Sequence, residues 1–249
     1  MSHTSGDTDN HKAEISFIPS SHWGEDVLVD VKLVEHNLLG IKNKVAPCKP
    51  RIIGVTKYFG LNAIVSGYKA GLRDFGESRA LEAIQKIEKL PREIRENSEF
   101  HFIGHLQTNK AEKVVEYFDY IQSVDSLKLA KVISKAACRL NKREKVLLQV
   151  NIACEEQKFG YDKECLRAEF SELMIQEGLD IVGLMAMAPL GANESELRKI
   201  FSDLRKFKEE LETDFNAILP ELSMGMSDDY SIAVSEGATM IRIGRKLFI

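Results

Sequence analysis

Two spacings of hydrophobic and polar residues alternate along the chain. Short apolar runs rich in β-branched residues, typical of buried strands, are separated by longer stretches whose apolar positions have helical spacing. A first helix is predicted over about residues 24–46, and the region of Pro47 and Pro50 ends it. Eight strands are predicted after it, at residues 51–56, 73–76, 99–104, 120–125, 145–152, 179–187, 221–227 and 239–245.

The order of these elements predicts the fold class. Strands that are apolar along nearly their whole length are covered on both faces, as in a parallel sheet with helices outside it. Eight strand–helix units in 249 residues fit an α/β fold, the single-domain (β/α)8 TIM barrel, with one extra N-terminal helix. A doubly wound open sheet is the alternative. It would normally carry a G-x-G-x-x-G turn after its first strand, where this chain has VTKYFG.

Local signals predict two boundaries. Glu196 follows Asn193 with the spacing of a capping box, so a helix is predicted to begin after Asn193. The first twenty residues have neither the basic nor the apolar region of a secretory signal. Their polar composition predicts a flexible extension over residues 1–22, followed by the barrel domain over residues 23–249.

Composition excludes several classes of protein. Hydrophobic residues make up 44% and charged residues 29%, as in ordinary globular domains, and the net charge of −4 comes from signs mixed along the chain. We therefore expect no nucleic-acid partner. Membrane insertion is not expected either, because no apolar run approaches the roughly 18 residues that a span needs. The four cysteines lack C-x-x-C spacing, which predicts free thiols and a cytoplasmic location.

Lys57 raises the first chemical question, because it directly follows an apolar strand. Active sites of such barrels lie at the C-terminal ends of the strands, so this amine can face a site. Lysine is nucleophilic only as the neutral amine, which requires a lowered pKa from desolvation or a nearby positive charge, and Arg242 is a candidate neighbour. The alternative is an ordinary surface charge.

The last two strand ends carry residues suited to a phosphate. Loops after the seventh and eighth barrel strands commonly bind phosphate through backbone N–H groups. Ser227 is predicted at the start of a helix, and Gly244 lets the backbone approach an anion closely. Asp228 and Asp229 are expected in the first turn of that helix, where its dipole favours acids. The alternative is that Ser227 is only an N-cap and Gly244 only a turn residue.

Two histidines, His101 and His105, have a spacing that could suggest a metal pair. That pairing requires a helix, whereas the FHFIG segment is predicted as a strand, in which four residues span roughly 13 Å. No metal site is therefore predicted.

Taken in order, the strand ends resemble a known family. The motifs are VTK, FGESR, HFIGHLQTNK, SVDSLKLA, LLQVNIACEEQKFG, GLMAMAP, LSMGMSDDY and GATMIRIGRKLF, running from about residue 50 to the C-terminus. They resemble the YggS/PROSC family of pyridoxal-phosphate homeostasis proteins. The resemblance implies a barrel like the N-terminal domain of alanine racemase, with pyridoxal 5'-phosphate (PLP) as cofactor.

The resemblance also implies roles for particular residues. Lys57 would form the Schiff base with PLP, and Arg242 would meet the pyridine nitrogen. Ser227 and the backbone of Gly244 and Arg245 would bind the phosphate. Ser78, where many relatives have Asn, would contact the cofactor from the side of the second strand. Arg245 stands where many relatives have Thr or Ser, so a backbone N–H contact there is kept and a side-chain hydroxyl contact is lost.

Three functions are compatible with the resemblance. The implied one is a PLP carrier without efficient catalysis, which serves apo PLP-dependent enzymes. The second is a PLP-dependent amino-acid racemase, which needs acids or bases on both faces of the ring; relatives of that kind take one from a second domain, for which we expect no room in 249 residues. The third is a regulatory protein whose PLP-bound form is sensed by a partner. A monomer is expected.

Overall fold

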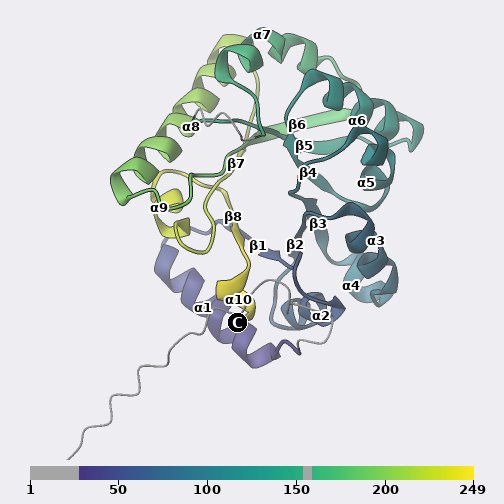
Figure 1. Ribbon diagram of the computed structural model, residues 1–249, viewed down its shortest axis with the longest axis vertical. Helices are drawn as coiled ribbons and strands as arrows, with labels where there is room; N and C mark the ends of the chain where they lie inside the picture. The colour runs from purple at the N-terminus through teal and green to yellow at the C-terminus, as the bar shows by residue number, and fades with distance from the viewer. Residues whose placement is uncertain (1–27, 154–158) are drawn as a thin grey trace, which may run out of the picture.

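Residues 28–153 and 159–249, described by a computed structural model, form one closed barrel (Figure 1). Its strands pair in chain order, each parallel to the next, and the last pairs with the first. They are β1 (Arg51–Val55), β2 (Asp74–Glu77), β3 (Glu99–Phe102), β4 (Tyr120–Val124), β5 (Glu144–Gln149), β6 (Leu179–Met185), β7 (Glu221–Ser223) and β8 (Met240–Ile243). The predicted (β/α)8 barrel is confirmed, and the open sheet is ruled out.

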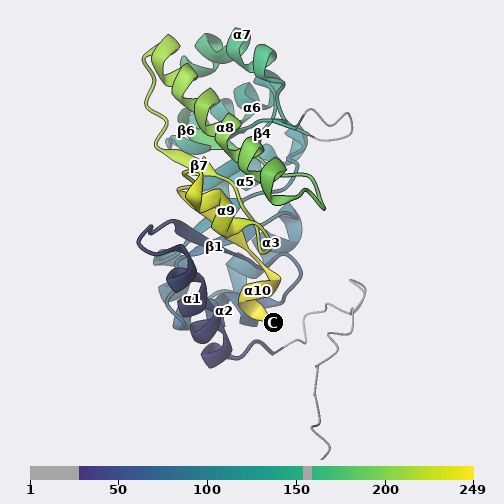
Figure 2. The same ribbon diagram turned by 90° about the vertical axis from the view of Figure 1, so that its left-hand side faces the viewer.

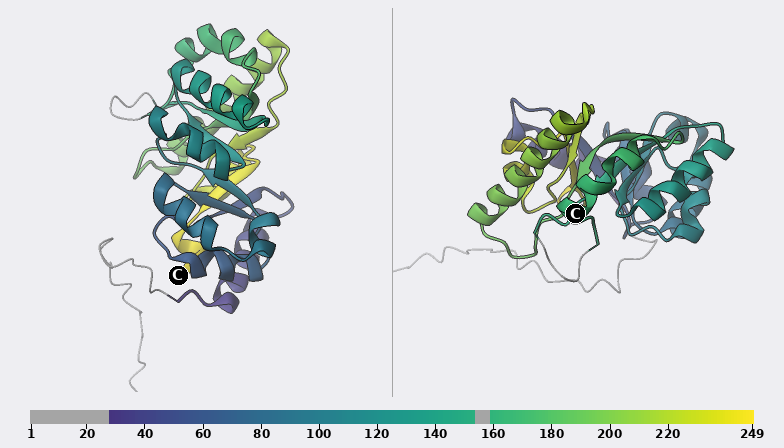
Figure 3. Two further views of the ribbon diagram at one scale, coloured as in Figure 1. Left: turned by 90° about the vertical axis from the view of Figure 1, so that its right-hand side faces the viewer. Right: turned by 90° about the horizontal axis from the view of Figure 1, so that it is seen from above.

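Helices surround the barrel on the outside (Figures 1 and 3). They are α1 (Val31–Val45), α2 (Leu61–Lys69), α3 (Ala80–Lys89), α4 (Arg92–Glu96), the 3-10 helix η2 (Thr108–Lys110), α5 (Ala111–Tyr117), α6 (Leu127–Arg139), α7 (Lys163–Met174), α8 (Glu194–Phe215), α9 (Tyr230–Ser235) and α10 (Arg245–Phe248). The helix after β8, α10, has only four residues. The extra helix α1 packs against α10, α2 and α9, so it completes the outer layer there (Figure 2).

Both faces of the strands are buried, as the apolar runs predicted. Ile52 belongs to the large hydrophobic cluster that includes the helices, whereas its neighbour Ile53 packs inside the barrel with Leu147 and Met240. Successive strand residues point to opposite faces, so a strand covered on both sides is apolar throughout. In β4 every residue is buried.

The first helix begins later than predicted. Asp30 caps it, because its Oδ1 accepts hydrogen bonds from the N–H groups of Lys32 at 2.6 Å and Leu33 at 3.1 Å, and α1 therefore starts at Val31. The predicted residues 24–27 of this helix, and the predicted boundary after residue 22, lie outside the described residues.

The capping box predicted for the longest helix is confirmed. At the start of α8, the N–H of Glu196 donates to Asn193 Oδ1 at 3.0 Å, and the N–H of Asn193 donates to Glu196 Oε2 at 2.8 Å. The two residues thereby satisfy backbone donors that the first turn of a helix leaves without partners.

The later strands end earlier than predicted, and β7 differs most. It ends at Ser223 rather than at residue 227. Gly225 has a φ of +90°, which is unfavourable for residues other than glycine, and the Met226 N–H donates to the side chain of Asp229 at 2.5 Å. This turn uses a backbone group that a continuing strand would need for pairing. Likewise β5, β6 and β8 end at Gln149, Met185 and Ile243.

Two further sequence predictions concern the surface. Cys48, Cys138 and Cys165 are free and exposed, as predicted, and Cys154 lies outside the described residues. Among the helices of residues 28–153 and 159–249, none combines the length and apolar character required to cross a membrane.

Candidate functional site

Lys57 lies two residues beyond the end of β1, at the end of the barrel where ligands bind in this fold. Its side chain is half-buried, and its Nζ is 4.9 Å from the centroid of the Tyr58 ring. The guanidinium of Arg79, after β2, is 5.9 Å from the same ring. Tyr58 thus contacts two cations at this end of the barrel, and the amine of Lys57 is held beside an aromatic face.

A buried ion pair supports the strand end that carries Lys57. Thr56 donates through Oγ1 to Glu77 Oε1 at 2.8 Å, and Lys86 Nζ donates to the same oxygen at 2.9 Å and to the Thr56 carbonyl at 3.0 Å. Glu77 is 1% exposed, and burial raises the pKa of its carboxyl while Lys86 and Thr56 act in the opposite direction. Sequence reasoning missed this pair, because nothing in the local pattern distinguishes Glu77 and Lys86 from surface charges.

Arg242 lies in β8 and is buried, with 4% of its surface exposed. Its two terminal nitrogens donate to Ser223 Oγ at 2.6 Å and to the Ala186 carbonyl at 2.8 Å, and no ion pair within residues 28–153 and 159–249 includes it. Burial lowers its pKa to about 10, with Asp229 opposing this shift, so the group remains charged at neutral pH. A guanidinium has five N–H groups. Two of them bond to residues that the structure describes, so donors remain for a ligand as far as that part of the chain is concerned.

The pairing of Arg242 with Lys57 stays a prediction. β8 and β1 are neighbours, and Arg242 lies opposite Ile53, four residues before Lys57. Within the described part of the chain, no hydrogen bond or ion pair joins the two side chains. The two residues therefore belong to adjacent strand segments, and no hydrogen bond or ion pair joins them in the described part of the chain.

Ser227 lies in the loop between β7 and α9, three residues before the helix begins. The expectation that it starts the helix is wrong, and so is the expectation that Asp228 and Asp229 occupy the first turn. Asp229 is the N-cap residue, is 8% exposed and accepts the Met226 N–H, whereas Asp228 is exposed. Burial raises the pKa of Asp229, with the Met226 N–H and Arg242 opposing this shift.

Gly244 and Arg245 form the junction between β8 and α10. Gly244 is the N-cap residue, and Arg245 is the first helical residue with an exposed side chain. The Nζ of Lys246 lies 3.4 Å from the Ser227 carbonyl, which brings the β7–α9 loop next to α10. The first N–H groups of a helix have no intrahelical acceptor, so Arg245 and Lys246 offer two backbone donors here.

Ser78 follows β2 and is half-buried. It lines a cavity of about 390 Å³ with, among others, Arg79, Glu82, His105 and Lys110. Gly104 packs directly over it: a Cβ at this glycine would lie 2.3 Å from the Ser78 carbonyl oxygen, so only glycine fits. The backbone of Ser78 is therefore fixed by its neighbour after β3.

The six predicted residues fall into two neighbouring groups. Because β8 pairs with β1, the groups lie on adjoining parts of the barrel. One follows β1 and β2, and the other belongs to β8 and the loops after β7 and β8. The members are Lys57 and Ser78 in the first group, and Ser227, Arg242, Gly244 and Arg245 in the second.

The two histidines separated by four residues do not face each other. His101 lies inside the barrel, where its Nε2 is 3.0 Å from Asp74 Oδ1, whereas His105 lies beyond β3 and stacks on Phe159 at 3.9 Å between centroids. Asp74, Glu99 and His101 place possible ligand atoms within 4.8 Å of one another. The guanidinium of Arg51 lies 2.8 Å from Glu99 and 3.4 Å from Asp74, so a cationic side chain already neutralises this cluster.

Comparison with known proteins shows the class of barrel to which this chain belongs. Residues 29–249 match the family model described as alanine racemase, N-terminal domain. An alanine racemase from Clostridium difficile 630 has a TM-score of 0.72 at 18% identity, with 88% of this chain and 60% of that chain covered, which shows the shared barrel fold. The protein is therefore a barrel of the alanine racemase N-terminal-domain type.

Sequence relatives narrow this assignment. The chain is 42% identical over 202 residues to a pyridoxal phosphate homeostasis protein from Synechocystis sp., covering 81% of this chain and 92% of that protein. It is 37% identical to the protein of the same name from Aquifex aeolicus, covering 80% and 86%. PipY from Synechococcus elongatus PCC7942, solved with PLP bound, is 40% identical with a TM-score of 0.79, covering 87% of this chain and 100% of that chain. This chain belongs to the family of pyridoxal phosphate homeostasis proteins.

Proposed function

We propose that this protein binds PLP at the C-terminal end of its barrel and serves in intracellular PLP homeostasis. The observation that carries the proposal is a buried arginine, Arg242, whose guanidinium makes two hydrogen bonds within the described residues and lies on the strand next to β1, which is followed by Lys57. The PLP-bound structure of PipY, a relative 40% identical in sequence, supports it.

The residues fit the three functional groups of PLP. Lys57 would supply the amine for the aldehyde, with which a neutral amine condenses to a Schiff base and releases one water. Arg242 supplies an N–H donor for the pyridine nitrogen. Because a guanidinium cannot accept a hydrogen bond, the ring nitrogen that it meets stays unprotonated.

The phosphate fits the loops after β7 and β8. The hydroxyl of Ser227 and the N–H groups at the start of α10 can donate to phosphate oxygens. A Cβ at Gly244 would meet only Val55, at 3.6 and 3.7 Å, so the packing of the protein itself leaves space beside this backbone. Ser78 belongs to the other group of residues, after β2, and from there its hydroxyl can donate to the ring substituents.

A carrier is favoured over an enzyme. When bound, PLP supplies an electrophilic aldehyde and an electron-withdrawing ring, whose strength depends on protonation of the ring nitrogen. Arg242 keeps that nitrogen unprotonated and so weakens the electron sink. Racemisation also needs proton transfer on both faces of the ring, whereas Lys57 alone can transfer a proton on one face. We propose that recipients are apo PLP-dependent enzymes or a regulatory protein.

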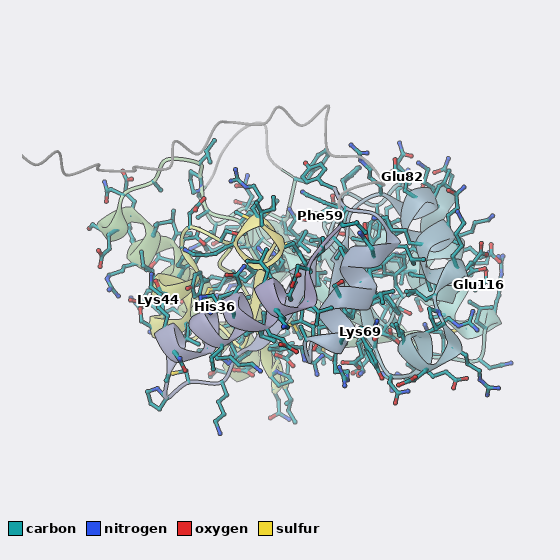
Figure 4. All side chains as sticks on the ribbon, turned by 90° about the horizontal axis from the view of Figure 1, so that it is seen from below. His36, Lys44, Phe59, Lys69, Glu82 and Glu116 are labelled. Carbon is teal, nitrogen blue, oxygen red and sulfur yellow. The ribbon has the colours of Figure 1, made fainter. Side chains whose placement is uncertain are left out.

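The second candidate is weak amino-acid racemase activity, which the alanine racemase fold favours. A titration of the purified protein with PLP, followed by visible absorption, tests both functions when L-alanine is then added and its chirality assayed. We expect a visible band that Lys57→Ala abolishes and no turnover. The matched control is Lys69→Ala, at the exposed end of α2 (Figure 4), which keeps the band. Rapid racemisation would establish the enzyme, and absence of a band in the wild type would refute PLP binding.

Oligomeric state and location are proposals as well. The three exposed free cysteines suit a reducing compartment, so we propose a cytoplasmic protein. We also propose a monomer, which light scattering after size exclusion would contradict by showing twice the chain mass.

A further inference from the structure

A chain of buried polar side chains runs through the interior of the barrel and begins at Arg242. Its members are buried: Ser223, Gln122 and His101 are each at most 1% exposed. Around them the interior is apolar, with Ile53, Leu147, Met185 and Met240 packed together. Burying polar groups among such residues is unfavourable unless every group is hydrogen-bonded.

Every link of this chain is within hydrogen-bonding distance. Arg242 donates to Ser223 Oγ at 2.6 Å, and Ser223 Oγ is 2.7 Å from Gln122 Oε1. The amide nitrogen of Gln122 lies 3.0 Å from His101 Nδ1. At the far side of the imidazole, His101 Nε2 lies 3.0 Å from Asp74 Oδ1.

The two ends of the chain determine where each proton lies. A guanidinium can only donate, so Ser223 accepts from Arg242 and donates a hydrogen bond through its own hydroxyl to Gln122 Oε1. The Gln122 amide nitrogen then faces His101 and can only donate, so Nδ1 accepts. His101 therefore carries its proton on Nε2 and donates it to the carboxylate of Asp74. All the donors point in the same direction along the chain, and in such an arrangement each hydrogen bond strengthens the next.

The end at Asp74 is itself fixed. Arg51 lies 3.4 Å from Asp74 and 2.8 Å from Glu99, and Lys145 lies 3.3 Å from Glu99. The ring of His101 stacks on Tyr120, with 4.5 Å between the centroids and 13° between the planes. The imidazole is thus held on its face and at both nitrogens, which makes it a rigid support rather than a mobile side chain.

We propose that His101 is a positioning residue for the cofactor site: through Gln122 and Ser223 it fixes the orientation of the Arg242 guanidinium and the direction of the N–H groups that Arg242 offers to the pyridine nitrogen. This role rests on the proposed function, because the direction of the Arg242 N–H groups matters for binding only if Arg242 meets the pyridine nitrogen of PLP. The order Arg242, Ser223, Gln122, His101 and Asp74 links five strands of the barrel and makes the support independent of the surface loops.

Two substitutions at one position test the proposal. His101→Asn places an amide oxygen near the Nδ1 position, where it can accept from Gln122, whereas His101→Leu offers no acceptor. Asn fills the space of the imidazole less well than Leu does. If His101 served only in packing, His101→Asn would be the more harmful change; if it positions Arg242, His101→Asn restores what His101→Leu loses.

The first readout needs no cofactor. The side-chain N–H signals of Arg242, recorded by ¹⁵N NMR in the PLP-free protein, are expected to move in His101→Leu and to return towards their wild-type values in His101→Asn. His36→Asn, on the exposed face of α1 (Figure 4), is the control and leaves them unchanged. Unmoved Arg242 signals in His101→Leu would overturn the proposal. If that variant does not fold, Gln122→Leu breaks the same chain, and unmoved signals there would overturn it equally.

The second readout uses PLP. In His101→Leu the dissociation constant for PLP is expected to rise about tenfold, as for one misdirected hydrogen bond to a charged donor, and in His101→Asn to stay within about twofold of the wild type. Equal constants in wild type and His101→Leu would contradict the role in cofactor binding. A wild-type protein without PLP affinity would refute the proposed function alone, since the NMR experiment would still report whether His101 orients Arg242.

Discussion

The two ends of the barrel differ in whether their cationic side chains form ion pairs. At the N-terminal end, Arg51 and Lys145 are paired with Glu99, and both cations lie near the ring of Tyr120, at 5.3 Å for Arg51 and 4.7 Å for Lys145. At the C-terminal end, Arg242 is buried without an ion pair in the described residues and uses two of its five donors. The first end is neutralised by the protein itself, and the second retains donors for a ligand.

This difference agrees with the general division of labour in such barrels. Residues at the N-terminal end serve stability, and residues at the C-terminal end serve function. The Glu77–Lys86 pair is instructive because it lies at the functional end and is fully paired. It stabilises the end of β1 just before Lys57, so the residue proposed to bind the cofactor follows a rigid part of the chain.

The largest expected effect comes from breaking that support. Glu77→Ala leaves Lys86 partly buried without its carboxylate and leaves the Thr56 hydroxyl without its acceptor. We expect the free energy of unfolding to fall by about 3 kcal/mol, measured by urea denaturation. The matched control is Glu82→Ala, which removes an exposed ion pair with Arg79 and should cost less than about 1 kcal/mol. Equal losses in both variants would contradict the role assigned to Glu77.

The second prediction concerns Arg242, which forms no ion pair with the residues that the structure describes. Arg242→Leu removes the proposed donor for the pyridine nitrogen, so the PLP dissociation constant should rise about 30-fold, the equivalent of about 2 kcal/mol for one charge-assisted hydrogen bond. Fluorescence or absorption titration measures it. Arg92→Leu, which changes an exposed arginine of α4, should leave PLP binding unaltered. Unchanged affinity in Arg242→Leu would mean that this arginine does not face the cofactor.

The third prediction tests the N-terminal end through pH. Glu144, the buried first residue of β5, has a carboxyl pKa raised to about 7 by burial, with Lys142 at 2.8 Å opposing the shift. Between its ordinary value of 4.5 and about 7, the unfolded chain releases this proton while the folded protein retains it. The free energy of unfolding therefore falls across that interval and levels off above it.

Replacing the carboxyl by a neutral amide removes this dependence. Relative to the wild type, Glu144→Gln should gain about 2 to 3 kcal/mol in the free energy of unfolding between pH 5 and pH 8. Urea denaturation of both proteins at the two pH values gives the difference and cancels the contributions of other groups. A difference that stays constant with pH would show that Glu144 titrates normally.

The smallest effect is expected at an exposed residue of the C-terminal end. Arg245→Ala should change PLP affinity less than about twofold, because the side chain is exposed and the proposed contact uses the backbone N–H. A loss of tenfold or more in a PLP titration would instead place the guanidinium on the phosphate. The result thus separates backbone from side-chain recognition at the start of α10.

The barrel could be predicted from the sequence because its signals are local. Apolar runs mark strands covered on both faces, and the position of Lys57 directly after such a run places it at the ligand-binding end. The end of β7 could not be predicted, since it depends on the positive φ of Gly225 and on a hydrogen bond between Met226 and Asp229. For the same reason Asp229 was expected in a helix that begins after it.

Contacts between distant residues were also inaccessible to sequence reasoning. Gln122 and Ser223 are 101 positions apart, and His101 and Asp74 are 27 apart, so no spacing rule relates them. Each polar side chain lies next to an apolar residue of its strand, and that interruption is the available sequence signal. It indicates a buried polar group without identifying its partner.

The measurement that tests the central claim most directly is chemical trapping. Reduction of the PLP-loaded protein with borohydride adds hydride to the C=N bond and makes the link permanent, after which peptide mapping by mass spectrometry locates it. We predict one phosphopyridoxyl group per chain, on Lys57. A group on Lys86 or Lys246 instead, or none on Lys57 at saturating PLP, would contradict the assignment of the C-terminal end of β1 as the site that holds the cofactor.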